Sequence, residues 1–137
     1  MNEIDKEANY RAMLYATALA AESSEDSRWD AVTRIADQDV LTRIAKTDKS
    51  HYVRAAAVDR IADHGVIDQI AKTDSSGYVR WAAVRHITNQ AVLEQIAMSD
   101  KSDDVRAAAF TSLGIISKKM KEGNDGYRNK EHDRRSI

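Results

Sequence analysis

Residues 53–61 read Val-Arg-Ala-Ala-Ala-Val-Asp-Arg-Ile, and related stretches begin at residues 27, 79 and 105. The four copies therefore begin at equal intervals along the chain. A fixed period of this kind is typical of proteins that stack one small structural unit several times along an axis. The period predicts a repeat array, and the other segments of the chain are interpreted in relation to it.

The composition is that of a folded protein of modest size. The 137 residues are 42% hydrophobic and 31% charged, and the net charge is −1 at pH 7, unlike that of disordered chains. No apolar run approaches the roughly 20 residues of a membrane span, and the polar start of the chain does not resemble a secretory leader. Cysteine is absent, which excludes disulfides and thiolate chemistry. We expect a cytoplasmic protein without a membrane partner, and a monomer rather than an oligomer.

The periodic segments are expected to be helices, because proline is absent and Ala, Ile, Val and Arg are frequent. At 100° per residue, Val53, Ala56, Ala57, Val58 and Ile61 fall on one face, which predicts the buried side. Between copies of this pattern lies a shorter apolar stripe, which predicts a second and shorter helix in each unit. The helices with the quoted pattern are expected over about 27–37, 51–63, 77–88 and 103–117.

The two ends of the chain depart from the repeat. Residues 1–25 contain a helical pattern over 3–22 that matches the repeat poorly, and we interpret it as an N-terminal capping helix. The repeat array occupies residues 26–116. Residues 117–137 lack an apolar period and contain 7 basic and 4 acidic side chains, so we expect a basic, disordered C-terminal tail.

The joints between the helices repeat as well. The segments 47–50, 73–76 and 99–102 each place an Asp and a Ser before the next helix, where they can accept hydrogen bonds from unpaired amide groups. At the other kind of joint, Gly65 is expected to adopt a left-handed conformation that ends a helix.

This pairing of helix patterns resembles the HEAT-like repeats, particularly the short bacterial kind, over about residues 26–116. The resemblance implies an all-α fold, a right-handed α–α superhelix (solenoid) of about four helix pairs. In that family an Asp in the turn and an Arg early in the second helix form a hydrogen-bonded ladder between repeats. Glu22 and Arg28 form an imperfect copy of this motif, so we interpret the charges as structural. The matching residues here are Asp48, Arg54, Asp74, Arg80, Asp100 and Arg106.

The helix face opposite the buried one is the candidate binding surface. In one unit it contains Tyr52, Ala55 and Asp59, and the equivalent residues of the next unit are Tyr78, Trp81 and Arg85. The resemblance implies that this face lines a concave surface. Exposed aromatic residues beside Arg anchor partners in many protein interfaces, although each Trp could instead pack over a neighbouring alanine. Replacing Trp81 with Ala is expected to abolish partner binding at little cost in stability. The candidate partner-binding residues are Trp29, Tyr52, Tyr78, Trp81, Arg85, Arg34, Arg60 and His86.

Three of these residues, Arg34, Arg60 and His86, form a second row at equivalent positions. A basic row beside aromatic residues could engage phosphate or a carboxylate-rich peptide, so nucleic acid is an alternative partner. Interleaved acidic residues such as Asp59 and Asp63, together with the near-neutral net charge, argue against it.

Signs of an enzyme are weak. The four histidines show no metal-ligand spacing, and the chain contains neither a Gly-rich phosphate loop nor a nucleophile elbow. We therefore expect no catalytic residue, metal or cofactor. Some HEAT-like proteins are DNA glycosylases or bilin lyases that use Trp and Asp on the concave surface, and Trp29, Trp81 and Asp59 could mimic that arrangement. The preferred function is non-enzymatic: a protein–protein binding module or scaffold with a protein partner.

Overall fold

The computed structural model describes residues 2–135, with side chains through Glu122. No strand occurs within these residues, which confirms the predicted all-α class. None of the helices in this part of the chain combines the length and the apolar character needed to cross a membrane. The helices are α1 (Glu3–Leu19), α2 (Glu25–Val32), α3 (Gln38–Thr47), α4 (His51–Val58), α5 (His64–Thr73), α6 (Gly77–Val84), α7 (Gln90–Ser99) and α8 (Asp103–Arg135).

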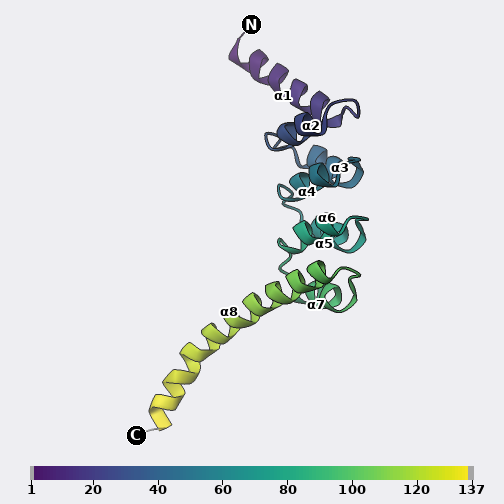
Figure 1. The fold of residues 1–137 in the computed structure, drawn as a ribbon. Helices are drawn as coiled ribbons and strands as arrows, with labels where there is room; N and C mark the ends of the chain where they lie inside the picture. Colours follow the sequence, from purple (N-terminus) through teal and green to yellow (C-terminus); the bar gives the residue numbers. More distant parts are fainter. Residues whose placement is uncertain (1, 136–137) are drawn as a thin grey trace.

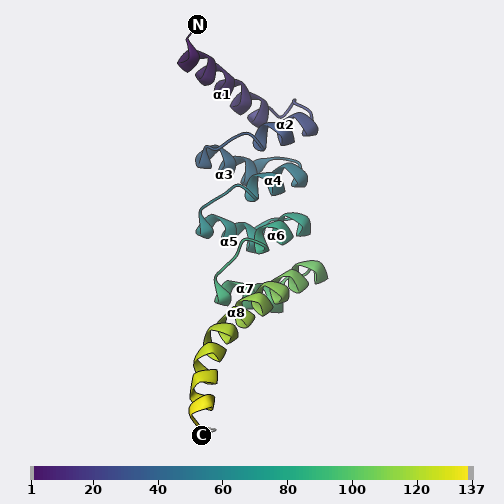
Figure 2. The ribbon, with the colours of Figure 1, turned by 90° about the vertical axis from the view of Figure 1, so that its left-hand side faces the viewer.

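The helices pack in consecutive pairs. Helix α1 packs against α2, α3 against α4, α5 against α6, and α7 against α8. The pairs follow one another along one direction, from α1 and α2 at one end to α7 and α8 at the other (Figure 1). The same order is seen after a turn of 90° (Figure 2). The second helices of the pairs form a continuous row, because α4 contacts both α2 and α6, and α6 contacts α8.

Helix α1 lies at the N-terminal end of the stack, where the sequence predicts a capping helix. It packs on α2 as α3 packs on α4, and it buries Leu14 and Ala18. It ends at Leu19, short of residue 22, because the backbone of Ala20 is extended. The first half of α1, which includes the exposed Ile4, projects beyond the stack (Figure 1), and Met13 in the second half is exposed as well.

The predicted relative lengths of the helices from α2 to α7 were wrong. Helices α2, α4 and α6, which contain the Val-Arg pattern, have 8 residues, whereas α3, α5 and α7 have 10. After Val58 the chain tightens into a turn, since the amide of Arg60 donates to the carbonyl of Ala57 (3.0 Å). The side chain of Asp63 then caps the start of α5. Gly65 lies inside α5 and has no positive φ, so its predicted role in ending a helix was also wrong.

One contiguous hydrophobic core runs through the stack. Val53, Ala57 and Val58 have 0% exposure, as the helical periodicity predicted, and Ile61 has 7%. Ala55, which the sequence placed on the exposed face, is buried to 4% exposure. The reason is that α4 has α2 on one side and α6 on the other, so a side chain as short as that of Ala is covered from both directions.

Buried ion pairs join each pair of helices to the next. The guanidinium of Arg28 donates to Asp48 (2.9 and 3.1 Å), that of Arg54 to Asp74 (3.1 and 3.1 Å), and that of Arg80 to Asp100 (2.9 and 3.1 Å). A further nitrogen of Arg54 and of Arg80 donates to the backbone carbonyl of the Asp six residues before it. Two-pronged contacts of this kind fix both distance and orientation, so they set the spacing of neighbouring pairs.

The ladder contacts shift the pKa values of Arg28 and Asp100. The hydrogen bond to Asp48 raises the pKa of Arg28 against the opposing effect of burial. Burial alone would raise the pKa of the Asp100 carboxyl, but the hydrogen bonds from Arg80 and from the amide of Ser102 bring it below its ordinary value. Both shifts favour the charged forms of these two side chains in the folded protein.

Helix α8 differs from the predicted C-terminal tail. The sequence predicted disorder over 117–137, but α8 continues as helix to Arg135, and residues 136–137 lie outside the described part. The segment contains no proline and has many Lys, Arg and Glu residues, which favour helix once the packed first turns have provided a nucleus.

Candidate functional site

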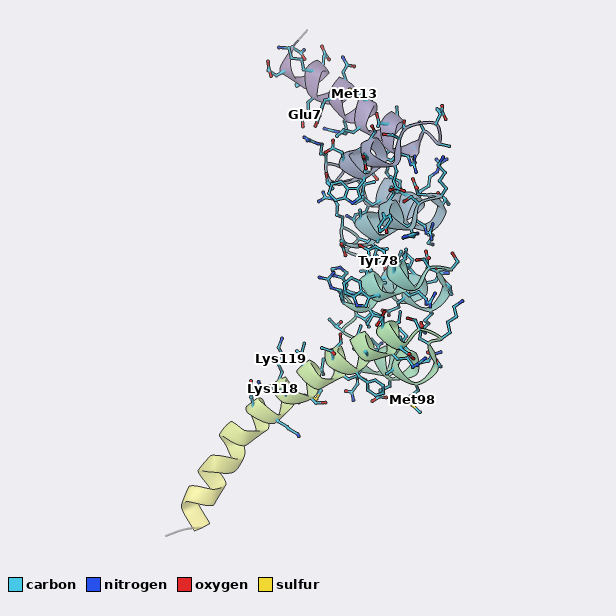
Figure 3. The ribbon with its side chains drawn as sticks, viewed as in Figure 1. Glu7, Met13, Tyr78, Met98, Lys118 and Lys119 are labelled. Carbon is cyan, nitrogen blue, oxygen red and sulfur yellow. The ribbon has the colours of Figure 1, made fainter. Side chains whose placement is uncertain are left out.

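Aromatic side chains from α4 and α6 form a contiguous cluster on one side of the stack. The ring of Tyr52 lies edge-on to that of Tyr78, with centroids 5.3 Å apart, and Tyr78 stacks on Trp81 at 6.1 Å. His51 joins the cluster through contacts with both tyrosines, at 4.2 and 5.8 Å. Tyr52 and Tyr78 remain about half exposed, at 50% and 47%, and the labelled Tyr78 lies along the stack beside α6 (Figure 3). The structure therefore brings together Tyr52, Tyr78 and Trp81 from the predicted set.

Arg85 extends this cluster with a positive charge. Its guanidinium carbon lies over the Trp81 ring, 4.9 Å from the centroid, which is a cation–π contact. Arg85 is exposed, and among the side chains of residues 2–122 it has neither a hydrogen-bond acceptor nor an ion-pair partner. The stacked ring holds the guanidinium in place while its N–H groups stay available to an incoming carboxylate or phosphate.

A groove of about 950 Å³ lies between α6 and α8, beside the aromatic cluster. Tyr78, Trp81 and Arg85 form the wall on the α6 side. The opposite wall is made of smaller side chains, because Ala107 stands in α8 at the position that Trp81 holds in α6. The α8 residues of the groove are Asp104, Ala107, Ala108, Thr111, Ser112 and Ile115.

Trp29 lies apart from this groove. It is 48% exposed on α2, two helix pairs away from Trp81, and the buried Ala55 occupies the equivalent position between them. Trp81 is half-buried, whereas Ala107 is exposed. The equivalent position therefore holds Trp in α2, Ala in α4, Trp in α6 and Ala in α8. The Ala in α8 is exposed and lines the groove.

Each member of the predicted basic row has a hydrogen-bond partner within the protein. Arg60 donates twice to the carbonyl of Ile35, at 3.0 and 2.7 Å, and Nε2 of His86 lies 2.8 Å from Oδ1 of Asp59. Arg34 contacts Asp30 at 3.3 Å and the hydroxyl of Tyr10 at 3.5 Å, and the bond with Tyr10 is the main reason that its pKa is raised. Each member of the row therefore contacts the preceding helix pair or a helix of its own pair, which gives the row a role in packing.

The residues suggested by the enzymatic alternative are not gathered into one site. Asp59 is engaged with His86, and it does not line the groove that contains Trp81. Trp29 belongs to another part of the stack. Among the described residues, no group of three or more His, Cys, Asp or Glu side chains is arranged to hold a metal ion.

The sequence did not reveal three features of the site. His51 was considered only as a metal ligand, although its place one residue before Tyr52 at a helix start brings it into the cluster. Ser112 lines the groove from the end of the last copy of the pattern, and Ile115 lines it from just beyond that copy. The groove itself depends on the separation of α6 and α8, for which a periodic pattern gives no signal.

The chain was compared with protein families, curated proteins and solved structures, and the geometry of the site is the basis for assigning a function. No protein family matches the chain, and neither the curated proteins nor the solved structures give a match.

Proposed function

We propose that the protein is a non-enzymatic protein-binding module, a HEAT-like α-solenoid that takes a peptide segment of its partner in the groove between α6 and α8. The observation that carries the proposal is the Arg85 guanidinium in the wall of the groove. It lies over the Trp81 ring, 4.9 Å from the centroid, and its N–H groups have no acceptor among the side chains of residues 2–122. Aromatic residues and Arg in a concave site are the usual anchors of protein interfaces.

The chemistry of the groove indicates the kind of segment that fits. Trp81, Ala107 and Ile115 offer apolar surface for an aliphatic or aromatic side chain. Arg85 offers two parallel N–H donors, which suit a carboxylate. The proposed ligand is therefore a peptide with an apolar residue close to an Asp or Glu, or to a free C-terminus.

The solenoid architecture is part of the same proposal. It is supported by the constant period of the sequence, by the consecutive packing of helix pairs and by the ladder of Arg28, Arg54 and Arg80. Stacked helix pairs of this kind present long exposed faces, which are well suited to binding extended segments.

Nucleic acid and base-excision chemistry are not proposed. The basic row that suggested phosphate binding contacts a carbonyl and carboxylates of the protein, as with Arg60 and Ile35. Asp59, the suggested catalytic carboxylate, is held by His86 away from the groove.

The test is a selection of displayed random peptides against the immobilised protein, followed by affinity measurements on two variants. Arg85→Ala removes the cation, and Ala107→Trp fills the groove with the residue type found at the same position in α2 and α6. Both sites are exposed, so both variants are expected to fold. Selected peptides should combine an apolar and an acidic residue, and each variant should bind them at least about tenfold more weakly.

Two control variants are matched to these changes. Arg43→Ala removes an exposed Arg from α3, and Ala36→Trp adds a Trp at an exposed Ala outside the groove. Both controls should bind the selected peptides as tightly as the wild-type protein. Equal binding by Arg85→Ala and Ala107→Trp, or a selection without enrichment, would contradict the proposal.

A further inference from the structure

The two ends of the stack show which positions of the repeat face a neighbouring helix pair. Val32, Val58 and Val84 are equivalent and have 0% exposure, whereas Phe110, at the same position in α8, is 58% exposed. This position therefore faces the following helix pair, and after α8 no such pair covers it, since α8 continues as a single helix to the end of the described residues. A large aromatic residue stands uncovered where the inner helices have a buried Val.

The ladder is also open at this end. The side chain of Arg106 is 33% exposed, compared with 3% for Arg28, 12% for Arg54 and 4% for Arg80. Its hydrogen bonds go to Asp103 in its own helix and to the carbonyl of Asp100, so it has no acceptor from a following pair within the described part of the chain. We call the exposed surface around Arg106 and Phe110 the C-terminal face.

The opposite end offers the complementary positions. Glu22 lies one sequence period before Asp48 and is exposed, so it places a carboxylate at this end of the stack. Its turn differs from the later ones, since Arg28 donates to the carbonyl of Ser23, five residues before it, whereas Arg54 donates to that of Asp48, six residues before it. Leu19, the last residue of α1, is 40% exposed. Ser27 replaces the Val that is fully buried at position 53. We call the surface formed by Leu19, Glu22 and Ser27 the N-terminal face.

We propose that the C-terminal face of one copy docks on the N-terminal face of a second copy, so that the chains associate head to tail. Arg106 of one copy then bonds to Glu22 of the next, which continues the ladder across the interface. Phe110 of one copy is then covered by the N-terminal face of the next, where the small Ser27 stands in place of a Val. This association was not expected from the composition, and it is independent of peptide binding in the groove.

The charges at the two ends fit the same arrangement. Residues 1–25 contain 2 basic and 5 acidic side chains, whereas residues 117–137 contain 7 basic and 4 acidic side chains. The start of α1 and the end of α8 lie on the same side of the stack in both views (Figures 1 and 2). Met13 and Met98, near the two ends of the stack, show how far apart these surfaces lie within one copy (Figure 3). Only a contact between copies can bring them together, and head-to-tail contact of this kind is open-ended.

The experiment is sedimentation velocity over a range of protein concentrations, with Arg106→Glu, Glu22→Arg, a mixture of the two, and the double variant. The wild-type protein should show a mass that rises with concentration, and high salt should weaken its association. In each single variant, two like charges face each other at the junction between copies, so the variant should associate at least about tenfold more weakly than the wild type. The double variant restores an opposite-charge contact at every junction, so it should associate again. In the equimolar mixture, Arg106 of the Glu22→Arg chain meets Glu22 of the Arg106→Glu chain, so mixed pairs should form.

Three outcomes would overturn the proposal. They are a wild-type protein that stays monomeric at all concentrations, a Glu22→Arg variant that associates like the wild type, and a mixture that behaves like its separate components. The second outcome would instead indicate contact between two C-terminal faces. Circular dichroism of each variant checks folding, which these exposed substitutions should leave intact. Phe110→Ser provides an uncharged variant that should also weaken association.

Discussion

Arg80 and Arg106 occupy the same position in consecutive second helices, yet they have different surroundings. Arg80 is 4% exposed and donates to both oxygens of Asp100, whereas Arg106 is 33% exposed and pairs only within its own helix and turn. The identity of a residue therefore does not determine its contribution to stability, since the contribution depends on whether a following helix pair supplies a carboxylate.

This difference can be measured by chemical unfolding in dilute solution. Arg80→Ala leaves Asp100 buried without its cation, and we expect the free energy of unfolding to fall by about 3–5 kcal/mol. Arg106→Ala removes a partly exposed pair and should cost less than about 1 kcal/mol. Equal effects of the two substitutions would show that the ladder does not stabilise the stack.

The lowered pKa of Asp100 predicts a dependence of stability on pH. The folded state binds the proton of this carboxyl more weakly than the unfolded chain does. The contribution of the ionised carboxyl to the free energy of unfolding is therefore fully present above the unfolded pKa of about 4. It is lost as the pH falls from there through the lower folded pKa. The free energy of unfolding of the wild type, measured with urea, should fall over this acidic range. That of Asp100→Asn should depend less steeply on pH. An unchanged slope would exclude Asp100 as a contributor.

At the scale of the element, the helix starts follow from short polar motifs. The side chain of Asp63 accepts hydrogen bonds from the amides of Gly65 (2.8 Å) and Val66 (3.2 Å) at the start of α5. Asp63→Ala should therefore lower the free energy of unfolding by about 1 kcal/mol. Asp68→Ala, within the same helix, is the control and should change stability little. Thermal unfolding of both variants tests this, and equal melting temperatures would contradict the capping role.

The element scale also shows how far the sequence could predict the structure. The helical class, the buried face around Val53 and the capping positions such as Ser50 were correctly predicted, because each depends on residues within one or two turns. The length of α4 was not predicted, since it depends on where the turn after Val58 tightens. The burial of Ala55 depends on the helices on both sides of α4, which no local pattern describes.

The candidate site was predictable only in part, for a similar reason. Tyr52, Tyr78, Trp81 and Arg85 were expected on one face, and the structure places them in one cluster. The exclusion of Trp29 and the engagement of Arg60 depend on distances between helix pairs. Equivalent positions in a repeat have the same orientation, but their neighbours decide whether they are available to a partner.

For the whole molecule, the main contacts of each helix pair among the described residues are with the pairs next to it. Hydrogen exchange should therefore be slowest for the buried amides of α4 and α6, which have second helices on both sides. The amides of the first half of α1 and those of residues 117–122 should exchange fastest, because the side chains there are largely exposed. Uniform protection along the chain, measured by mass spectrometry of peptides, would show that the molecule opens as a single unit.

The ladder also has a consequence for how such a protein can evolve. Arg28, Arg54 and Arg80 each reach the Asp that lies 20 residues further along, and each repeat unit brings one donor and one acceptor. Removal of residues 51–76 would join Ser50 to Gly77 and leave Arg28 opposite Asp48 and Arg80 opposite Asp100. A gene segment that encodes one whole unit can therefore be duplicated or lost without breaking the register of the ladder. Segments of most other lengths would place the Arg of one unit opposite the wrong residue. The spacing of these charges therefore favours the gain or loss of whole units.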